Sequence, residues 1–290
     1  MYLIITPCKN EIDNLPKLVE SVMKQTIRPI MWVIVDDGSS DGSKNIEKEA
    51  ASKNSWIHIL EINEEHKRDL GPHLSQNIKR GFEYAVDFLK ENDLDYKFIG
   101  NLDADLSIPS SFFEELVDEF NLDDTLGIAS SGIKLTKNGQ LVHVTGLPED
   151  EPSGGNMLMR RECYEDCGSI PVSYSWDSVL KAKARFKGWK TKRFEKIIAV
   201  ESRDVSNAEG YWNGYIVYGQ SSYYLGFHPL HIILKSCIYI SKKPYYIGFA
   251  YLVGYFYDFF LRKEQIADDE LKQYFKRKWV IAIKKYLPRR

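Results

Sequence analysis

The sequence is poor in cysteine and has none of the cysteine patterns that hold metals or cross-link secreted domains. Its four cysteines, Cys8, Cys163, Cys167 and Cys237, are spread over 290 residues without metal-finger spacing or a dense disulfide framework. This spacing argues against a zinc site and suits a reducing compartment. The chain enters an apolar run at Tyr2 without a charged leader or an apolar signal segment. We therefore expect no secretion signal and a cytoplasmic location.

The chain also lacks a strong charge of one sign. Its 39 Lys and Arg residues nearly balance 41 Asp and Glu residues, and the net charge of −2 gives no reason to expect a nucleic-acid partner. The balance is uneven, because residues 262–290 contain ten basic and four acidic residues, a net charge of +6. The Gly-x-Gly-x-x-Gly pattern of dinucleotide-binding proteins, the P-loop pattern and internal repeats are absent from the sequence.

Apolar runs alternate with helical patterns in the N-terminal part of the chain. Strand-like runs at residues 2–5, 31–35, 57–62 and 98–102 are separated by helical periodicity at 15–23, 43–53 and 74–91. This order predicts an α/β fold with a mostly parallel central sheet, flanked by helices that make right-handed crossovers. Asn10 or Asp13 is expected to cap the first helix.

The second half of this region is predicted to be mixed. Asn138-Gly139 is a strong two-residue turn signal, so residues 133–144 should form a β-hairpin. The further elements that we expect are a helix from Pro109 to Phe120, a strand at 127–134, a helix at 161–167, a helix from Ser175 to about Gly188, and two short strands at 190–194 and 197–200.

Three of the predicted strands end in polar or acidic residues. The ends are Thr6-Pro7-Cys8-Lys9-Asn10-Glu11, Asp36-Asp37-Gly38-Ser39-Ser40-Asp41-Gly42 and Asp103-Ala104-Asp105. Ligands of open parallel sheets bind at the carboxyl ends of the strands, so these ends describe one site. In an extended backbone, Asp103 and Asp105 would project to the same side. They could then hold a divalent cation, although a solvated turn has the same pattern.

These motifs, taken in order, resemble the family 2 glycosyltransferases, which have the GT-A fold. Trp176-Asp177 follows them at a similar spacing, Asn77, Gly81 and Ala85 resemble the family's second helix, and Gly154-Gly155-Asn156 resembles its acceptor-side segment. The resemblance extends over roughly residues 1 to 205. It implies a nucleotide-diphosphate sugar as donor, Mn²⁺ or Mg²⁺ as cofactor, and inversion at the anomeric carbon.

The resemblance also implies roles for individual residues. Thr6, Pro7 and Glu11 would contact the nucleoside, Asp36 or Asp37 would bind the base or ribose, Asp103 would lie at the ribose and the metal, and Asp105 would ligate the metal. A cation bridging the diphosphate would stabilise the charge of the leaving group. Arg68 or Lys67 could pair with the diphosphate, and a solvated loop charge is the alternative.

Asp177 is the candidate general base. A carboxylate in reach of a sugar hydroxyl can accept its proton during attack on the face opposite the leaving group. A helix N-cap is the alternative for Asp177. The family usually has an acid before this aspartate, whereas Trp176 stands there in this chain and could stack on a sugar. Gly154 and Gly155 are placed on the acceptor side.

The C-terminal part differs in character, so we divide the chain into residues 1–222 and an appendage, residues 223–290. Residues 223–241 and 245–261 are apolar and aromatic, but each run is shorter than the roughly 20 residues of a spanning helix. With the basic tail, they favour two helices lying in the headgroup region of an anionic cytoplasmic leaflet. A homodimer contact or soluble helical subdomain, and true spanning, are the alternatives.

Together, these features predict a metal-dependent enzyme on the inner face of the cell membrane. It would transfer a sugar, by default from a UDP-sugar, to a hydroxyl of a glycan or lipid-linked acceptor in cell-surface polysaccharide or glycoconjugate synthesis. A polyprenyl-phosphate acceptor is the alternative, and it would need no base. Two alternatives come from other functional classes, namely a haloacid-dehalogenase-type phosphatase and a catalytically dead membrane-attached binding module. A sugar nucleotidyltransferase is disfavoured because a Gly-rich loop with a basic residue does not follow the first strand.

Overall fold

The computed structural model describes residues 1–62, 71–137, 140–202, 210–241 and 243–286. The chain divides into two compact units. The sheet unit comprises Met1–Val172 with Trp176–Arg203, and the helical unit comprises Ser173–Ser175 with Asp204–Arg290. Each unit is described by itself.

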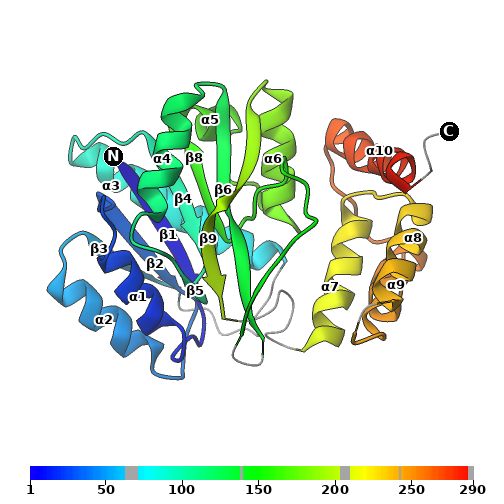
Figure 1. The fold of residues 1–290 in the computed structure, drawn as a ribbon, viewed down its shortest axis with the longest axis horizontal. Coiled ribbons are helices and arrows are strands. Elements are labelled where there is room, and N and C mark those ends of the chain that lie inside the picture. Colours follow the sequence, from blue (N-terminus) through cyan, green and yellow to red (C-terminus); the bar gives the residue numbers. More distant parts are fainter. Residues whose placement is uncertain (63–70, 138–139, 203–209, 242, 287–290) are drawn as a thin grey trace. The chain divides into compact units, whose positions relative to one another are not determined.

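In the described residues, the sheet unit contains one nine-stranded sheet (Figure 1). Its strands are β1 (Tyr2–Cys8), β2 (Met31–Asp36), β3 (Ile57–Glu61), β4 (Phe98–Leu102), β5 (Leu106–Ser107), β6 (Leu126–Lys137), β7 (Gln140–His143), β8 (Asn156–Arg160) and β9 (Lys190–Glu201). The order is β3-β2-β1-β4-β8-β6-β9-β5, with β7 paired to β6. Strands β1 to β4 are parallel, as predicted, and β8 runs antiparallel to both β4 and β6.

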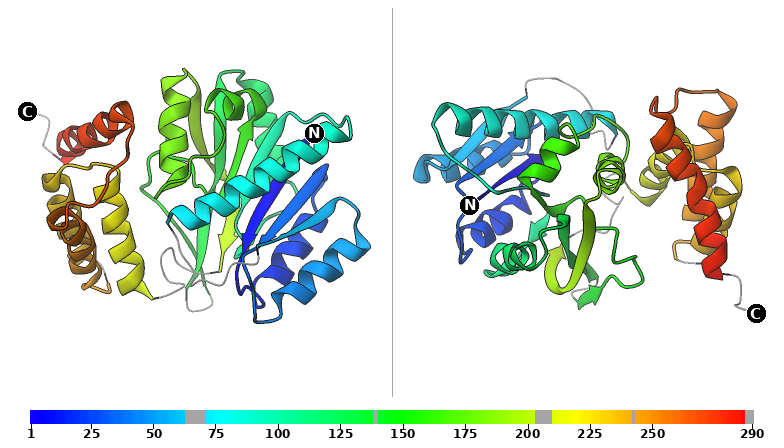
Figure 2. Two further views of the ribbon diagram at one scale, coloured as in Figure 1. Left: turned by 180° about the vertical axis from the view of Figure 1, so that it is seen from behind. Right: turned by 90° about the horizontal axis from the view of Figure 1, so that it is seen from above.

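Helices cover both faces of the sheet (Figures 1 and 2). They are α1 (Leu15–Met23), α2 (Ser43–Lys53), α3 (Pro72–Glu91), α4 (Phe112–Leu122), α5 (Arg161–Asp166) and α6 (Trp176–Phe186). One core cluster joins the sheet to α1, α2 and α4, and the other joins it to α3, α5 and α6. Successive side chains of β1 enter opposite clusters, because side chains alternate across a strand. Both faces of the sheet are therefore buried, and the polar residues of the candidate site lie at the carboxyl ends of the strands.

The mixed α/β fold class is confirmed, and two local predictions are wrong. Asn14, not Asn10 or Asp13, is the N-cap residue of α1, and its side chain makes no capping hydrogen bond. The two short strands expected at 190–194 and 197–200 are one strand, β9, with a register irregularity between Ser131 and Gly132 of its partner β6. The hairpin is confirmed, because Lys137 of β6 pairs with Gln140 of β7, while residues 138–139 lie outside the described residues.

The helical unit consists of α7 (Tyr211–Tyr224), α8 (Pro229–Ile240), α9 (Ile247–Phe260) and α10 (Asp269–Tyr286). Helices α7 and α9 approach closely through glycines, since a Cβ on Gly219 would lie 2.7 Å from the Tyr255 nitrogen and 3.1 Å from the Gly254 carbonyl carbon. This packing places α7 in the helical unit, although most of the helix precedes the boundary expected at 222/223. Among the described residues, no helix is both long and apolar enough to cross a membrane.

The close approach of α7 and α9 makes Gly219 sensitive to any added atom. We expect Gly219→Ala to weaken the α7–α9 pair by about 1–3 kcal/mol, because the new methyl group would meet backbone atoms that cannot move aside. Native-state hydrogen exchange of the α7 and α9 amides measures this local free energy. Gln273→Ala, at an exposed position of α10, is the control and should leave the exchange unchanged. Unchanged protection in Gly219→Ala would contradict the described packing.

Candidate functional site

The carboxyl ends of β1 and β2 lie side by side, because Cys8 pairs with Asp36 in the parallel register. The loops that follow these strands are joined by hydrogen bonds. The Asp37 amide donates to the Cys8 carbonyl at 2.8 Å, and the Glu11 amide donates to the Ser43 hydroxyl at 2.8 Å. The first two polar strand ends therefore form one continuous edge, as the sequence predicted.

Asp36, the last residue of β2, and Asp37, which follows it, lie in different surroundings. Asp36 is fully buried, accepts a hydrogen bond from the Ser39 amide at 3.0 Å, and has the Lys44 ammonium 3.3 Å away. The hydrogen bond and the charge of Asp36 raise the pKa of Lys44. Asp37 accepts a hydrogen bond from Asn77 at 2.9 Å and contacts His73 at 3.0 Å, so it fixes the start of α3 to this edge. Both carboxylates are thus held within the protein.

Three other residues predicted to bind the nucleoside lie in the same region. Thr6 is fully buried, and its hydroxyl accepts a hydrogen bond from the Trp32 indole at 3.0 Å. Glu11 is buried and accepts a hydrogen bond from the Asn14 side-chain amide at 2.8 Å. Pro7 is partly exposed. The roles assigned to them remain predictions, and Arg68 lies outside the described residues.

Asp103 and Asp105 follow β4 in a turn and not in an extended strand. The strand ends at Leu102, and the Leu106 amide donates to the Asp103 carbonyl at 3.3 Å, which closes the turn. The expected extended backbone at Asp103-Ala104-Asp105 is therefore wrong, and the binding of one cation by both carboxylates stays a prediction. The Asp103 carboxylate accepts a hydrogen bond from the Asn101 side-chain amide at 2.9 Å, and this amide also donates to the Gly154 carbonyl at 2.8 Å.

The segment Gly154-Gly155 lies between two of the predicted site residues. A Cβ on Gly155 would lie 3.0 Å from the Asp103 carboxyl carbon, and a Cβ on Gly154 would lie 2.7 Å from Cβ of Asp177. The Asp103 amide also donates to the Gly155 carbonyl at 2.8 Å. The absence of side chains at these two glycines thus allows their backbone to contact Asp103 on one side and Asp177 on the other.

Asp177 lies in the first turn of α6 and forms an ion pair with the buried Lys181, one turn later. The Lys181 ammonium contacts the Asp177 carboxylate at 2.9 Å, the Glu151 carboxylate at 3.4 Å and the Pro152 carbonyl at 2.8 Å. Burial opposes the charge of this ammonium, but the two carboxylates outweigh it and raise the pKa of Lys181. Lys181 thereby ties Asp177 to the segment that leads into Gly154.

Trp176 does not fit its predicted role as a platform for a sugar. Only 7% of its surface is exposed, and it packs in the core beside Leu180 and Ala184. Stacking on a ligand requires an open ring face, and the Trp176 ring is covered by protein. Trp176 therefore holds the start of α6 in place.

Asp103 and Asp105 supply the type of donor that Mg²⁺ and Mn²⁺ prefer. Carboxylate oxygens suit these cations, which commonly use one or two carboxylates together with phosphate oxygens and water. The described residues contain no group of three or more His, Cys, Asp or Glu side chains able to hold a metal by themselves. Two carboxylates fit a cation that takes its other ligands from a diphosphate and water. The Asn101 Oδ1 next to Asp103 is buried without a hydrogen-bond partner in the described part of the chain.

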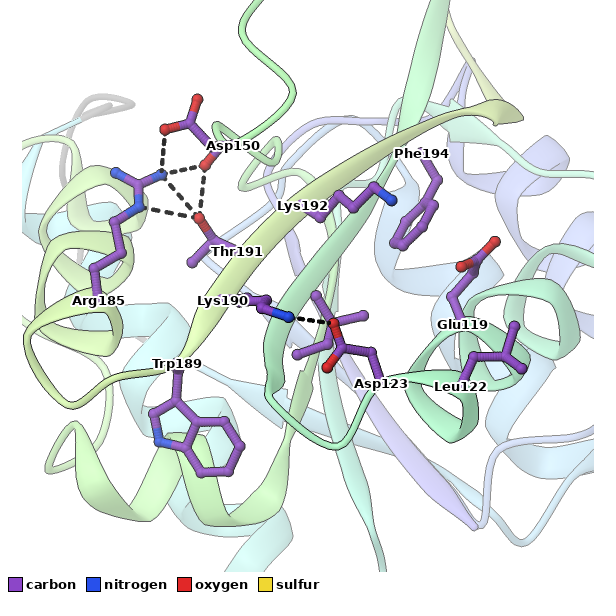
Figure 3. A pocket seen from close by; sticks show the side chains of 11 residues that line it. Glu119, Leu122, Asp123, Asp150, Arg185, Trp189, Lys190, Thr191, Lys192 and Phe194 are labelled. Atoms are coloured by element: carbon purple, nitrogen blue, oxygen red, sulfur yellow. Dashed lines mark hydrogen bonds and ion pairs between the residues drawn. The ribbon is translucent and has the colours of Figure 1, made fainter.

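A pocket of about 330 Å³ opens at the opposite end of the sheet, where β6 and β9 begin (Figure 3). Its lining includes none of the predicted site residues. Figure 3 shows Arg185 of α6 reaching Asp150 and Thr191, with 2.8 Å between Arg185 and the Thr191 hydroxyl. Arg185 thus fixes residue 150, just before Glu151, and supports the Gly154-Gly155 segment from a distance.

Three side chains that support the site were not predicted from the sequence. Asn101 stands in an otherwise apolar strand, and Lys181 lies four residues after Asp177. A polar residue in an apolar strand and a lysine one helical turn after an aspartate are both visible in the sequence. Each indicates a specific partner, since a buried polar residue normally has one. Glu47 of α2 is 1% exposed beneath Asp36. Burial, and then the charge of Asp36, raise the pKa of Glu47 to about 7.

Glu47 should make the stability of the protein depend on pH. Its ordinary pKa is 4.5, so between that value and about 7 the folded protein binds more protons than the unfolded chain. The free energy of unfolding therefore falls as the pH rises through this range, by about 2–3 kcal/mol between about pH 5 and about pH 8. Glu47→Gln should lack this fall, as measured by urea unfolding at both pH values.

Glu49→Gln on the same helix is the control, because Glu49 is exposed and pairs with Lys53. It should keep the pH dependence of the unchanged protein. An equal pH dependence in the unchanged protein and Glu47→Gln would contradict the assignment to Glu47.

Residues 3–134 match the family described as glycosyl transferase family 2. A curated relative from Pectobacterium carotovorum, undecaprenyl-phosphate 4-deoxy-4-formamido-L-arabinose transferase, is 34% identical over 118 residues, which are 40% of this chain and 32% of the relative. The matched part spans about a third of the length of the curated relatives.

Solved structures resemble the fold. The mannosyltransferase PcManGT from Pyrobaculum calidifontis, in complex with GDP-Man and Mn²⁺, has a TM-score of 0.55 at 15% identity, covering 99% of this chain and 76% of that chain. TarS 1–349 from S. aureus, in complex with UDP-GlcNAc, has a TM-score of 0.52 at 13% identity, covering 93% and 78%. The fold is thus that of the GT-A glycosyltransferases, and the N-terminal part of the chain, residues 3–134, is similar to glycosyl transferase family 2.

Proposed function

We propose that this chain transfers a sugar from a nucleotide-diphosphate donor to a hydroxyl group of a glycan or lipid-linked acceptor, with inversion at the anomeric carbon. The observation that carries the proposal is the Gly154-Gly155 segment, which brings Asp103 and Asp177 to its two sides. In this proposal the donor lies at the carboxyl ends of β1, β2 and β4, and the acceptor lies on the side of Asp177. The product belongs to cell-surface polysaccharide or glycoconjugate synthesis.

The donor is proposed to be a UDP-sugar. The proposal is supported by the UDP-GlcNAc complex of TarS, whereas PcManGT is a complex with GDP-Man, so the base is the part to be tested. Pro7, Glu11 and Asp36 or Asp37 would bind the nucleoside. Asp103 and Asp105 would hold Mn²⁺ or Mg²⁺, which when bound neutralises negative charge on the diphosphate leaving group.

Asp177 is proposed to act as the general base. Its Oδ2 is held by Lys181 at 2.9 Å, and in the described part of the chain its Oδ1 makes no hydrogen bond. Oδ1 would accept the proton of the acceptor hydroxyl, whose oxygen attacks the anomeric carbon from the face opposite the diphosphate. The backbone of Gly154 packs directly against the Asp177 side chain, because a Cβ at this position would lie 2.7 Å from Cβ of Asp177, so a larger residue at 154 would displace the proposed base.

The acceptor is proposed to be presented at the inner face of the cell membrane. Phe249, Val253, Tyr257 and Phe260 of α9 are exposed and recur every three or four residues, so they lie on one face of the helix. We call these residues the α9 stripe. Together with the basic C-terminal segment, the stripe favours peripheral attachment to an anionic leaflet, and a homodimer contact is the competing use of the same face.

A polyprenyl-phosphate acceptor is the second candidate. It is supported by the Pectobacterium relative, whose name specifies an undecaprenyl-phosphate transferase. A phosphate is already anionic and needs no base, so the importance of Asp177 separates the two candidates. The family match disfavours the phosphatase alternative, and measured turnover would exclude a catalytically dead binding module.

The proposed donor site can be tested by calorimetric titration with UDP, GDP and dTDP, each with and without Mn²⁺. We expect one nucleotide to bind and to require the metal, because two carboxylates would repel a diphosphate that lacks its cation. Asp105→Asn should lose most of this metal-dependent affinity. Asp87→Asn, on the exposed surface of α3, is the control. Metal-independent binding, or unchanged affinity in Asp105→Asn, would overturn the metal assignment.

The proposed base can be tested with Asp177→Asn, which keeps the shape of the side chain and an oxygen for Lys181. Loss of a general base lowers kcat by roughly 10²- to 10⁴-fold, whereas affinity for the donor should change by less than about twofold. Steady-state transfer and calorimetric donor binding measure the two effects separately. A fully active Asp177→Asn would exclude Asp177 as the base and favour the phosphate acceptor.

A further inference from the structure

The helical unit contains a pocket of about 540 Å³ whose lining shares no residue with the proposed transfer site. It is lined by the loop between α7 and α8, the C-terminal end of α9 and the first half of α10. Aromatic side chains, including those of Phe227, Tyr255 and Phe259, form an apolar part of the wall. None of the family motifs lies in this pocket.

The pocket wall is fixed by hydrogen bonds within the helical unit. The Tyr255 hydroxyl donates to the Phe227 carbonyl at 2.7 Å, and the Gln265 side-chain amide donates to the Tyr223 carbonyl at 2.9 Å. Phe227 also packs against Phe275 of α10, with ring centres 5.5 Å apart. The pocket is therefore built into the packing of the unit, so a ligand would meet a preformed site.

Three cations face this pocket, and the described residues that line it include no anion to balance them. Arg262, Lys272 and Lys276 line it, and none of the lining residues is Asp or Glu. Across the described part of the chain, the side chains of these three residues make no hydrogen bond or ion pair. The neighbouring Lys263 differs, because it pairs with Asp258 at 2.8 Å. Such a group of cations suits an oxyanion, and a phosphate offers several acceptor oxygens.

The apolar surface continues from the pocket to the outside of α9. Phe260 lines the pocket, is 76% exposed, and also belongs to the α9 stripe. A ligand with a phosphate head and a long apolar chain would place its head among the cations and its chain along Phe260 and the stripe. A free phosphate would leave this aromatic surface uncovered.

We infer that this pocket binds the phosphate group of a lipid, whose isoprenoid or acyl chain lies along the α9 stripe. The inference rests on the proposed function in one respect, the attachment to a membrane surface. It assigns to that attachment a discrete site with a stoichiometry of one lipid phosphate per chain. The transfer chemistry at Asp103 and Asp177 does not enter it.

The first test is calorimetric titration of the full chain with farnesyl phosphate below its critical micelle concentration. We expect saturable binding of one molecule per chain. Farnesol and inorganic phosphate should each bind at least roughly tenfold more weakly, because each lacks one half of the recognised structure. Equal affinity for farnesol would overturn the role of the cations, and equal affinity for inorganic phosphate would overturn the role of the apolar surface.

The second test compares two double variants with the same loss of charge. Lys272→Gln with Lys276→Gln should weaken farnesyl phosphate binding by roughly 10- to 100-fold, since two charged donors are lost. Lys243→Gln with Arg277→Gln, at exposed positions of the same unit outside the pocket, should change it by less than about threefold. Equal effects of the two double variants would overturn the assignment to this pocket. Circular dichroism checks that both variants fold.

A flotation assay separates this inference from membrane attachment. It uses phosphatidylcholine vesicles with and without phosphatidylglycerol. Flotation with anionic vesicles, without binding of farnesyl phosphate, would overturn the pocket and keep the attachment. Binding of farnesyl phosphate through Lys272 and Lys276, without flotation, would keep the pocket and overturn the attachment.

Discussion

The candidate site depends on one backbone contact, the passage of Gly154-Gly155 between Asp103 and Asp177. The contact is possible because β8 begins directly after these glycines and pairs with β4, the strand that ends before Asp103. The Asn101 amide fixes it further by donating to both the Asp103 carboxylate and the Gly154 carbonyl. Two carboxylates that are far apart in the sequence are thereby set on opposite sides of one short segment. The antiparallel insertion of β8 into a parallel sheet is what makes this arrangement possible.

Buried charge is the cost of this arrangement, and the structure balances it with cations and hydrogen bonds placed close to the strand ends. Asp36 has Lys44 beside it, and Asp177 has Lys181. Each lysine comes from a helix that starts at the same edge as its carboxylate. Removing Lys44 would leave the fully buried carboxylate of Asp36 without its cation, which is strongly destabilising. The supporting lysines are therefore as important for the integrity of the site as the carboxylates are for its chemistry.

Much of the fold could be predicted from the sequence, because local signals agree with the tertiary structure there. The helix expected at 43–53 has these bounds in the structure, and apolar periodicity also predicted α1 and β2. Predictions failed where the local structure is determined by contacts between residues far apart in the sequence. The turn at Asp103, the burial of Trp176 and the packing of α7 on α9 each depend on segments far away in the chain. The two site glycines were recognisable from their motif, but their contacts with Asp103 and Asp177 were not.

The C-terminal end of the sheet unit is hydrogen-bonded to the turn that carries the proposed metal ligands. Strand β5 follows Asp105 directly and pairs with the end of β9, and the Ser202 amide donates to the Asp105 carbonyl at 3.0 Å. The Ser202 hydroxyl also donates to the Asn14 side chain at 2.8 Å. For protein engineering, a version shortened to the sheet unit must therefore retain Ser202. A chain cut at Glu201 would keep every family motif and still leave the Asp105 turn without the residue that anchors it.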